Sequence, residues 1–428
     1  MSAGLRRKQA TSLFLDGGGD LDQGWPTRLA IAPETIFLWR RNGDEAPLAV
    51  LDRLVRERRR RGGESETGIA ALLGFDLLAP AGATRDDGLA LPELVALAVD
   101  CNVSFAPGSP PMLHGRTAAD VERGRQRIRH VLEASGDARG TRPIRVAPAG
   151  RPTTSLPRDE YLRAVGIVKD HIRAGDIYQA NLTQRFEIGH DGDAFELFCA
   201  LFDAAPGPRS AFVEADGLAV ASVSPETFLR STPDGRVETR PIKGTRPRSA
   251  DPEEDDALAR SLVESDKDRA ELLMVVDLER NDLGRVCRTG SIEVPELARL
   301  HSYAAVHHLV ARVTGRLLPE TGPARLIEST FPGGSVSGVP KTRALEILRL
   351  LEPVPRSFYT GSLLWFGDDG SLESSILIRT VLLSRGRAML GAGGAVVADS
   401  DPEGEWIESN HKVRRLARVL RFAPEEAS

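Results

Sequence analysis

The chain has 428 residues, of which 41% are hydrophobic and 27% are charged, and its formal net charge at pH 7 is −5. This composition is typical of a globular protein and excludes a fibrous repeat or wholesale disorder. The slight excess of acidic residues gives no field that would attract a polyanion, so we expect no nucleic-acid partner.

The sequence also predicts a cytoplasmic protein. No stretch approaches the about 18 consecutive apolar residues that a membrane-spanning helix needs. Residues 1–10 contain Arg6, Arg7 and Lys8 but lead into no apolar segment or cleavage site, which argues against a secretory signal. The three cysteines lie far apart, and their spacing predicts neither a disulfide framework nor a zinc site.

Lysine is rare in this chain. Of the 56 Lys and Arg residues, the lysines are Lys8, Lys169, Lys243, Lys267, Lys341 and Lys412. A lysine can lose its proton when it is desolvated, whereas an arginine cannot. Each lysine is therefore worth considering for a chemical role.

Residues 1–150 form the less regular part of the chain. Their patterns predict strands at 12–15, 28–32, 34–38 and 72–78, and helices at 46–60 and 118–135. Residues 136–157 are rich in Gly, Pro, Arg and Thr and lack periodicity, which indicates a linker. We therefore expect an N-terminal subdomain over residues 1–150 and a second domain over residues 151–428.

The second part mixes strands and helices without the regular order of a Rossmann or barrel protein. We expect Asp159 to cap a helix that ends at residue 173, ahead of Gly175. Further helices are predicted at 255–278 and 402–420, and strands at 179–187, 210–214, 219–224, 237–242, 309–318, 362–366 and 376–383. This mixture predicts an α+β fold with antiparallel sheet and no internal repeat.

Two of the predicted helices each place a pair of carboxylates on one face, Asp268 with Glu271 and Glu405 with Glu408. Apolar residues follow Glu271 at helical spacing, so we expect its carboxylate to point into an apolar face, where it needs a cation or hydrogen-bond donors. A few carboxylates, together with water and an anionic substrate, are the usual ligands of Mg²⁺. Ordinary salt bridges along a helix, for example with Lys412, explain the same spacing equally simply.

Glycine-rich segments of the second half offer backbone N–H groups to a ligand. The segment from Phe331 to Lys341 suits a carboxylate or a phosphate, although it lacks the spacing of a P-loop. Residues 391–395 predict a tight turn after a strand. Lys243 follows a predicted strand and precedes Gly244, where it is either a nucleophile with a lowered pKa or an ordinary exposed lysine.

The sequence contains no nucleophilic serine or cysteine motif and no His-Glu-x-x-His zinc motif. His308 either assists the chemistry or has a structural role on a helix. Together, the carboxylate pairs, the glycine-rich segments and Lys243 predict a site for a small, multiply anionic molecule with a divalent metal.

From about residue 161 to residue 420 the chain resembles the chorismate-utilising enzymes. The matching motifs are Gly175-Asp-Ile-Tyr-Gln-Ala-Asn-Leu182, Ser224-Pro-Glu-Thr-Phe228, Pro241-Ile-Lys-Gly-Thr245, Lys267-Asp-Arg-Ala-Glu271, Asp277-Leu-Glu-Arg-Asn-Asp-Leu-Gly-Arg285, Phe331-Pro-Gly-Gly-Ser335, Pro340-Lys341, Ile378-Arg-Thr380 and Val397-Ala-Asp-Ser400 through Glu408. The resemblance implies two packed antiparallel β-sheets flanked by helices and a chorismate-binding catalytic domain over residues 151–428. The N-terminal part matches loosely, through Phe14-Leu-Asp16 and Leu73-Gly-Phe-Asp76.

Within the family, Lys243 is similar to the lysine of the branch that makes aminodeoxychorismate, because the members that make anthranilate usually have Ala in that slot. The resemblance implies that Lys243 attacks C2 of chorismate while the C4 hydroxyl leaves, and that ammonia then adds at C4 and expels the lysine. Glu226 matches the general acid and base for the departing hydroxyl. His308 matches a position near the same hydroxyl.

The resemblance also implies the metal and substrate ligands. Glu271 and Glu408 match the Mg²⁺ ligands of the family, with Asp268 and Glu405 acting directly or through water. Arg379 matches the residue that would hold the enolpyruvyl carboxylate as a bidentate fork. The full set of matched substrate-binding positions is Gly244, Thr245, Ser335, Tyr359, Arg379, Gly393 and Gly394.

The chain departs from the family pattern at a few positions. Ala395 stands where the glycine turn usually has Gly, and its methyl would reduce the fit if the backbone needed a positive φ there. Ser335 replaces the Thr of the anthranilate branch, and Ser224-Pro-Glu226 replaces that branch's Asn-Pro-Ser-Pro-Phe-type segment. Both changes favour the aminodeoxychorismate branch.

The resemblance implies chorismate as the substrate and a separate glutamine amidotransferase subunit as the source of ammonia, since no glutaminase motif is visible. It also implies a role in the synthesis of 4-aminobenzoate and folate. The alternatives are an anthranilate, isochorismate or salicylate synthase of the same family, or a paralogue that binds chorismate or a partner without catalysis.

Overall fold

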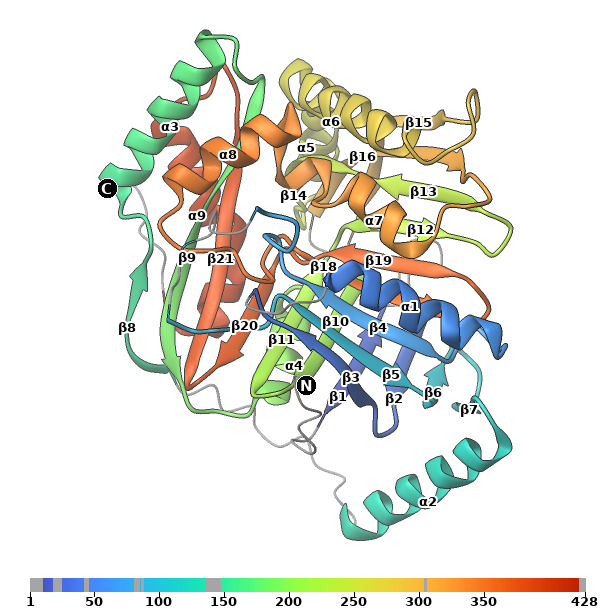
Figure 1. The fold of residues 1–428 in the computed structure, drawn as a ribbon. Coiled ribbons are helices and arrows are strands. Elements are labelled where there is room, and N and C mark those ends of the chain that lie inside the picture. The colour runs from blue at the N-terminus through green and yellow to red at the C-terminus, as the bar shows by residue number, and fades with distance from the viewer. Residues whose placement is uncertain are drawn as a thin grey trace.

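The computed structural model describes residues 11–17, 25–41, 46–80, 85, 88–135, 148–303 and 306–422. Within these residues the strands form two large sheets in which every neighbouring pair is antiparallel. Helices α3, α4, α8 and α9 pack on the first sheet, and α1, α5, α6 and α7 lie on the side of the second (Figure 1). The predicted fold class, α+β with two antiparallel sheets flanked by helices, is confirmed.

The first sheet has the strand order β17-β9-β21-β20-β11-β10-β1-β2-β6-β7, and β8 also pairs with β9. Its strands are β1 (Ser12–Asp16), β2 (Thr27–Ala30), β6 (Cys101–Phe105), β7 (Met112–Gly115), β8 (Pro148–Thr154), β9 (Gln179–His190), β10 (Arg209–Ala215), β11 (Leu218–Ser224), β17 (Gly338–Val339), β20 (Thr380–Ser384) and β21 (Arg387–Val396).

The second sheet has the order β14-β16-β13-β12-β19-β18-β4-β5-β3, and β15 also pairs with β16. Its strands are β3 (Glu34–Trp39), β4 (Gly68–Leu73), β5 (Leu94–Val99), β12 (Thr227–Ser231), β13 (Arg236–Arg240), β14 (Ile242–Pro247), β15 (Glu293–Ser302), β16 (Val306–Arg316), β18 (Ser362–Gly367) and β19 (Leu372–Ile376). Strands from both sides of residue 150 therefore share both sheets.

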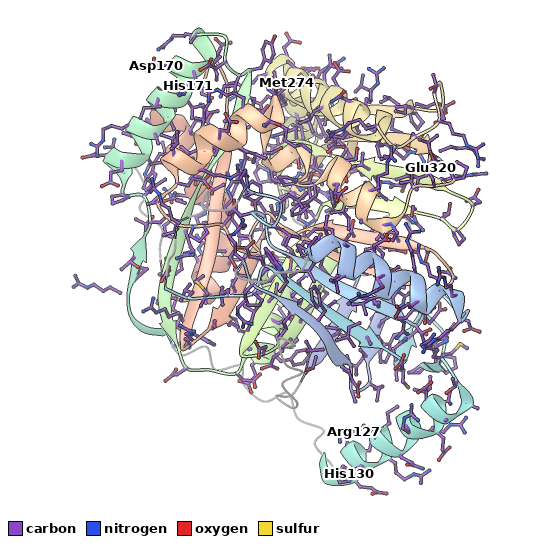
Figure 2. All side chains as sticks on the ribbon, viewed as in Figure 1. Arg127, His130, Asp170, His171, Met274 and Glu320 are labelled. Carbon is purple, nitrogen blue, oxygen red and sulfur yellow. The ribbon has the colours of Figure 1, made fainter. Side chains whose placement is uncertain are left out.

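The helices lie outside the sheets. One of them, α2, extends away from the body of the molecule and carries Arg127 and His130 (Figure 2). They are α1 (Pro47–Arg60), α2 (Ala118–Ser135), α3 (Arg158–Arg173), α4 (Ala194–Ala204), α5 (Pro252–Val263), α6 (Asp266–Gly284), α7 (Pro323–Thr330), α8 (Lys341–Leu351) and α9 (Pro402–Val419), with a 3₁₀ turn at Gly334–Val336.

The two sheets pack face to face through an apolar core. Leu13 of β1 and Val213 of β10 come from the first sheet, whereas Leu72 of β4 and Leu363 of β18 come from the second, and all are buried. Each such side chain contributes about 1.5–3 kcal/mol to folding when fully buried. Because this core joins both sheets, it fixes their relative position and that of the loops at their ends.

Several predicted boundaries were wrong for local reasons. The helix predicted over 255–278 is two helices, because Ser265 caps α6 by accepting a hydrogen bond from the Asp268 backbone N–H at 3.2 Å. The cap of α3 is Pro157 rather than Asp159, which lies in the first turn. The strand predicted over 376–383 is interrupted at Arg379, whose φ is +50°.

Strand positions differ in a similar way. The strand predicted over 72–78 lies earlier, as β4. The glycine-rich segment 391–395 is not a turn but the middle of β21, paired along its length with β9. In the predicted linker, residues 136–147 lie outside the described residues and residues 148–154 form β8. The N-terminal residues 1–10 also lie outside the described residues.

Candidate active site

Lys243 lies on β14 beside a β-bulge. The pairing of β14 with β16 shifts register between Lys243 and Thr245, and Gly244 between them has a φ of +73°. A Cβ at Gly244 would come within 2.7 Å of Leu262 Cδ1 and 3.0 Å of Asp268 Cγ, so both the backbone conformation and the space require glycine. A bulge of this kind redirects the neighbouring side chain.

The Lys243 ammonium reaches the glycine-rich loop that precedes α8. Its Nζ donates a hydrogen bond to the Ser335 backbone carbonyl at 3.3 Å. Burial lowers the pKa of Lys243, while the Glu271 carboxylate raises it and the Lys412 ammonium lowers it again. Partial desolvation of this kind shifts the equilibrium of the Lys243 side chain toward the neutral amine.

Glu226 lies in the turn between β11 and β12 and is only 3% exposed. Its backbone N–H donates to Ser224 Oγ at 3.2 Å, and its carbonyl accepts from the Ile376 N–H at 3.1 Å, so the turn is held on both sides. Among the described residues Glu226 Oε1 has no hydrogen-bond partner. Burial raises the pKa of Glu226 to about 7, against the opposing Ser335 hydroxyl and Lys243 ammonium. The carboxyl thus holds a proton near neutral pH.

His308 lies on strand β16 rather than on a helix, which corrects the sequence-based expectation. Its Nδ1 lies 2.9 Å from Thr245 Oγ1, whereas its buried Nε2 has no partner in the described part of the chain. Burial, and secondly the Arg379 cation, lower the pKa of His308 to about 3. The imidazole is therefore neutral and offers Nε2 to a ligand.

Arg379 lies in the segment between β19 and β20, and its guanidinium has no counter-ion among the described residues. No hydrogen bond or ion pair to its guanidinium is formed within the described residues, and burial, then the Arg415 cation, lower its pKa to about 10. A half-buried guanidinium that has no partner among the described residues suits a carboxylate ligand.

Tyr359 lies against the glycine-rich strand β21. A Cβ at Gly391 would come within 2.2 Å of the Tyr359 ring, so only glycine admits the ring there. Burial raises the pKa of the phenol, which stays protonated and can donate a hydrogen bond. Ala395 has no positive φ and pairs with Asn181 of β9, so its methyl causes no backbone strain.

The space in front of Gly394 is bordered by three charged atoms from α9. A Cβ at Gly394 would lie 3.1 Å from Glu405 Oε2, 3.4 Å from Lys412 Nζ and 3.8 Å from Glu408 Oε1. Lys412 Nζ lies 2.7 Å from Glu408 Oε1 and donates to the Gly393 carbonyl at 3.1 Å. Glu405 Oε2 is buried, and within the described ranges it has no hydrogen-bond partner.

The second carboxylate pair lies across the site on α6. Glu271 lies 3.9 Å from Lys267 Nζ, and Asp268 forms an ion pair with Arg246 at 3.0 Å. Glu271 and Glu408 act on each other and on Lys243 electrostatically, so these two predicted ligands lie within electrostatic range of the predicted nucleophile. Hard oxygen donors, one of them an orphaned buried oxygen, fit a Mg²⁺ ion.

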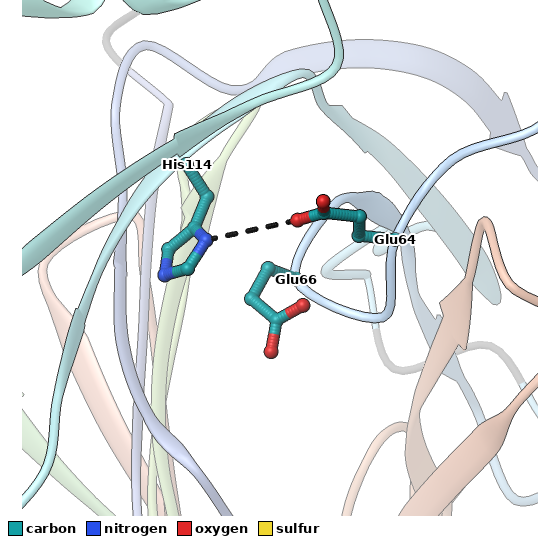
Figure 3. Close-up of side chains that lie close together, drawn as sticks. All are labelled: Glu64, Glu66 and His114. Atoms are coloured by element: carbon teal, nitrogen blue, oxygen red, sulfur yellow. Dashed lines mark ion pairs between the residues drawn. The ribbon is translucent and has the colours of Figure 1, made fainter.

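A different cluster has side chains close enough to share an ion. Ligand atoms of Glu64, Glu66 and His114 lie within 4.8 Å of one another (Figure 3). The Glu64 side chain is 77% exposed and lies 4.0 Å from His114 Nδ1. Nothing else at this surface indicates a ligand, so we do not identify it as the functional site.

A cavity of about 970 Å³ lies beside α6 and α8 and not at the predicted nucleophile. Its lining includes Met274 of α6 (Figure 2), together with Tyr178 and the ion pair between Lys341 and Asp282. Lys341 therefore belongs to the wall of this cavity, although its motif is part of the family resemblance.

Sequence reasoning missed several buried charged residues around the site. Glu352 and Arg356 form an ion pair, and Arg356 also donates to the Val336 carbonyl at 2.9 Å in the glycine-rich loop. Glu279 of α6 is buried as well. Its position one turn beyond Val275 and Val276 on the apolar face is a signal that could have identified it, rather than Glu271, as the buried carboxylate of this helix.

Comparison with known proteins places the chain in a family. The sequence model described as "chorismate binding enzyme" matches residues 21–418. The chain belongs to the chorismate binding enzyme family. An aminodeoxychorismate synthase component 1 from Klebsiella aerogenes is 45% identical over 266 residues, which are 62% of this chain and 59% of that protein. An aminodeoxychorismate synthase from Streptomyces griseus is 44% identical over 263 residues, which are 61% of this chain and 36% of that protein.

The chain thus spans about three fifths of the first curated relative and about a third of the second. The crystal structure of anthranilate synthase component I from Streptococcus pneumoniae TIGR4 superposes with a TM-score of 0.76 and 25% identity, covering 98% of this chain and 94% of that one. The family resemblance and the anthranilate synthase component I-like fold are confirmed. No helix among the described residues has both the length and the apolar character needed to span a bilayer.

Proposed function

We propose that the chain catalyses the aminodeoxychorismate synthase reaction, in which chorismate and ammonia give 4-amino-4-deoxychorismate and water. The observation that carries this proposal is that Lys243 is partly desolvated and interacts electrostatically with the buried carboxyl of Glu226. A lysine nucleophile needs a neutral amine, and a departing hydroxyl needs a proton, and these two side chains supply both.

In the first step the Lys243 amine forms a bond to C2 of chorismate. Both ring double bonds shift, from C1=C2 to C1=C6 and from C5=C6 to C4=C5, the C4–O bond breaks, and Glu226 donates its proton so that the hydroxyl leaves as water. The products are a secondary ammonium on Lys243 and a Glu226 carboxylate. The neutral His308 imidazole lies 2.9 Å from Thr245 Oγ1, and we propose that these two side chains hydrogen-bond the departing hydroxyl.

In the second step ammonia forms a bond to C4. Both ring double bonds shift back, the C2–N bond breaks, and Lys243 leaves as a neutral amine. The new C4 ammonium returns a proton to Glu226, so both residues regain their starting states. Two successive allylic displacements put nitrogen at C4, whereas direct attack of ammonia at C2 gives the ortho product.

The substrate's carboxylates would be held by groups that lack protein partners. Arg379 suits the enolpyruvyl carboxylate, because its guanidinium is half-buried and unpaired within the described residues. We propose that Glu271 and Glu408 hold Mg²⁺, with Glu405 and Asp268 acting directly or through water. When bound, the ion would neutralise the ring carboxylate and so favour the shift of electrons toward it. Ser335, Tyr359, Gly393 and Gly394 complete the proposed substrate site.

We further propose that a separate glutamine amidotransferase subunit supplies the ammonia and that the product serves 4-aminobenzoate and folate synthesis. The word "component" in the names of the relatives supports a partner chain. All three cysteines are free, which supports the cytoplasmic location that we propose. We also retain the division into a subdomain over 1–150 and a catalytic domain over 151–428 as a proposal.

The test is product analysis of the purified chain with chorismate, Mg²⁺ and ammonium. We expect 4-amino-4-deoxychorismate without release of pyruvate, and loss of this product in Lys243→Ala. Anthranilate with stoichiometric pyruvate would identify an anthranilate synthase, and isochorismate or salicylate would identify the other siblings. Absence of turnover in the presence of tight chorismate binding would identify a binding-only paralogue.

A further inference from the structure

Glu279 is a buried carboxyl that the proposed reaction does not use. It projects from α6, is 5% exposed, and its Oε2 accepts a hydrogen bond from Thr239 Oγ1 at 2.9 Å. Its Oε1 accepts no hydrogen bond within the described residues. A Cβ at Gly334 would come within 3.4 Å of Oε1, so the carboxyl lies directly beneath the loop that carries Ser335.

Glu279 forms no ion pair with any of the described residues. The charged groups that act on it are Glu226, Asp282 and Lys341. The Lys341 ammonium already pairs with Asp282 Oδ2 at 2.6 Å. Strand β13, which carries Thr239, pairs with β12 through Arg240 and Thr227, the residue after Glu226, so Glu279 and Glu226 are buried carboxyls at neighbouring positions. Placing a negative charge on both at once is unfavourable. Burial, with the Glu226 carboxylate second, raises the pKa of Glu279 to about 8, and the Thr239 hydroxyl opposes the rise.

We propose that Glu279 is a positioning residue that shares a proton with Glu226 and so keeps the acid form of Glu226 available at alkaline pH. The inference rests on the proposed role of Glu226 as proton donor. Two coupled acids titrate as a pair, so the proton that remains after the first ionisation is distributed over both carboxyls. If residue 279 cannot ionise, its negative charge no longer favours a proton on Glu226, so Glu226 loses its proton at a lower pH.

The first test compares kcat as a function of pH in Glu279→Gln and in the wild type, with product identity established first. Glutamine keeps an oxygen that accepts from Thr239 but cannot take part in the titration. We expect the alkaline limb to move to lower pH, with kcat at pH 8.5 about threefold or more below wild type and kcat at pH 6 nearly unchanged. Asp277→Asn, on the exposed side of the same helix, should leave the profile unchanged.

A uniform loss at every pH, or a profile that coincides with wild type, would overturn the proposal. Thr239→Val is the second variant, for use if Glu279→Gln folds poorly. Removing the donor to the Glu279 anion favours the protonated form of Glu279, so the alkaline limb should move in the same direction by a smaller amount.

Infrared titration of the free enzyme provides a readout that needs no turnover. The protonated-carboxyl band of Glu226 is identified by its loss in Glu226→Gln, and its midpoint should fall in Glu279→Gln. An unchanged midpoint contradicts the proposal even in an active enzyme. If the midpoint falls but the protein makes no aminodeoxychorismate, the shared proton is supported and only the proposed function is refuted.

Discussion

At the scale of single residues, the site is defined by buried polar atoms that the protein itself leaves without partners. Glu226 Oε1, His308 Nε2, Ser335 Oγ and Glu405 Oε2 all lack a hydrogen-bond partner in the part of the chain that the structure describes. A buried group without a partner costs about 1–3 kcal/mol. Each of the four belongs to a different motif, and a ligand that satisfies several of them recovers part of this cost.

The raised pKa of Glu226 gives a pH dependence of definite sign. Because burial raises the pKa to about 7, the carboxyl is protonated below that pH and the acid form is lost as the pH rises through it. We expect kcat to fall along this alkaline limb. Glu226→Gln should lower kcat by about 10²–10⁴-fold.

The same shift acts on stability. The unfolded carboxyl ionises at its ordinary, lower pKa, so wild-type stability falls as the pH rises from that value to about 7. Glu226→Gln should therefore be stabilised relative to wild type at pH 8 but not at pH 4, as measured by thermal denaturation. An equal effect of the substitution at both pH values would contradict a protonated, buried Glu226.

Gly391 tests the packing of the substrate site. Its substitution by Ala places a methyl within 2.2 Å of the Tyr359 ring, which must then move. We expect KM for chorismate to rise about tenfold, equivalent to roughly 1.4 kcal/mol of lost binding, and the melting temperature to fall. Gly166→Ala on α3 is the matched control, because a Cβ there meets nothing within 4 Å, and it should stabilise the helix by about 0.5–1 kcal/mol. Unchanged KM in Gly391→Ala would remove Tyr359 from the site.

At the scale of elements, the sequence predicted those with strong signals and misplaced those with local exceptions. The amphipathic helices α2 and α9 were predicted within a residue or so of their observed ends. Strand β21 was missed because a run of glycines favours a turn, although in this sheet the glycines admit the Tyr359 ring and the α9 carboxylates. The break between α5 and α6 was missed because Ser265 continues the polar pattern while acting as a cap.

Helix α9 carries two of the four predicted metal ligands, Glu405 and Glu408, on one face, so one experiment can test their contribution. Glu405→Gln keeps the shape but replaces the carboxylate that carries the orphaned oxygen Oε2 with a neutral amide. We expect the Mg²⁺ concentration for half-maximal activity to rise about 10–100-fold, with chelator abolishing activity in both proteins. Glu403→Gln, on the first turn and in contact with Arg158, is the control and should behave as wild type. Full activity in the presence of chelator would exclude a metal role for these residues.

At the scale of the whole molecule, the sequence predicted the fold class but not how the strands are interleaved, and its set of site residues remains a prediction. Strand β1 pairs with β10, and β4 pairs with β18, so strands far apart in the chain are neighbours in each sheet. The local hydrophobic pattern of the sequence predicts which residues form strands, but it does not predict which strands pair with each other. The buried position of Glu279, by contrast, follows from the helix period and could have been predicted.

The central claim is that Lys243 is a nucleophile, and intact-protein and peptide mass spectrometry tests it most directly. The enzyme is incubated with chorismate and Mg²⁺ in the absence of ammonia, acid-quenched and digested. The account predicts an added mass of chorismate less water on the peptide that contains Lys243, discharged when ammonium is supplied before quenching, and absent in Lys243→Ala. An unmodified Lys243 in an enzyme that forms aminodeoxychorismate at full rate would contradict the account.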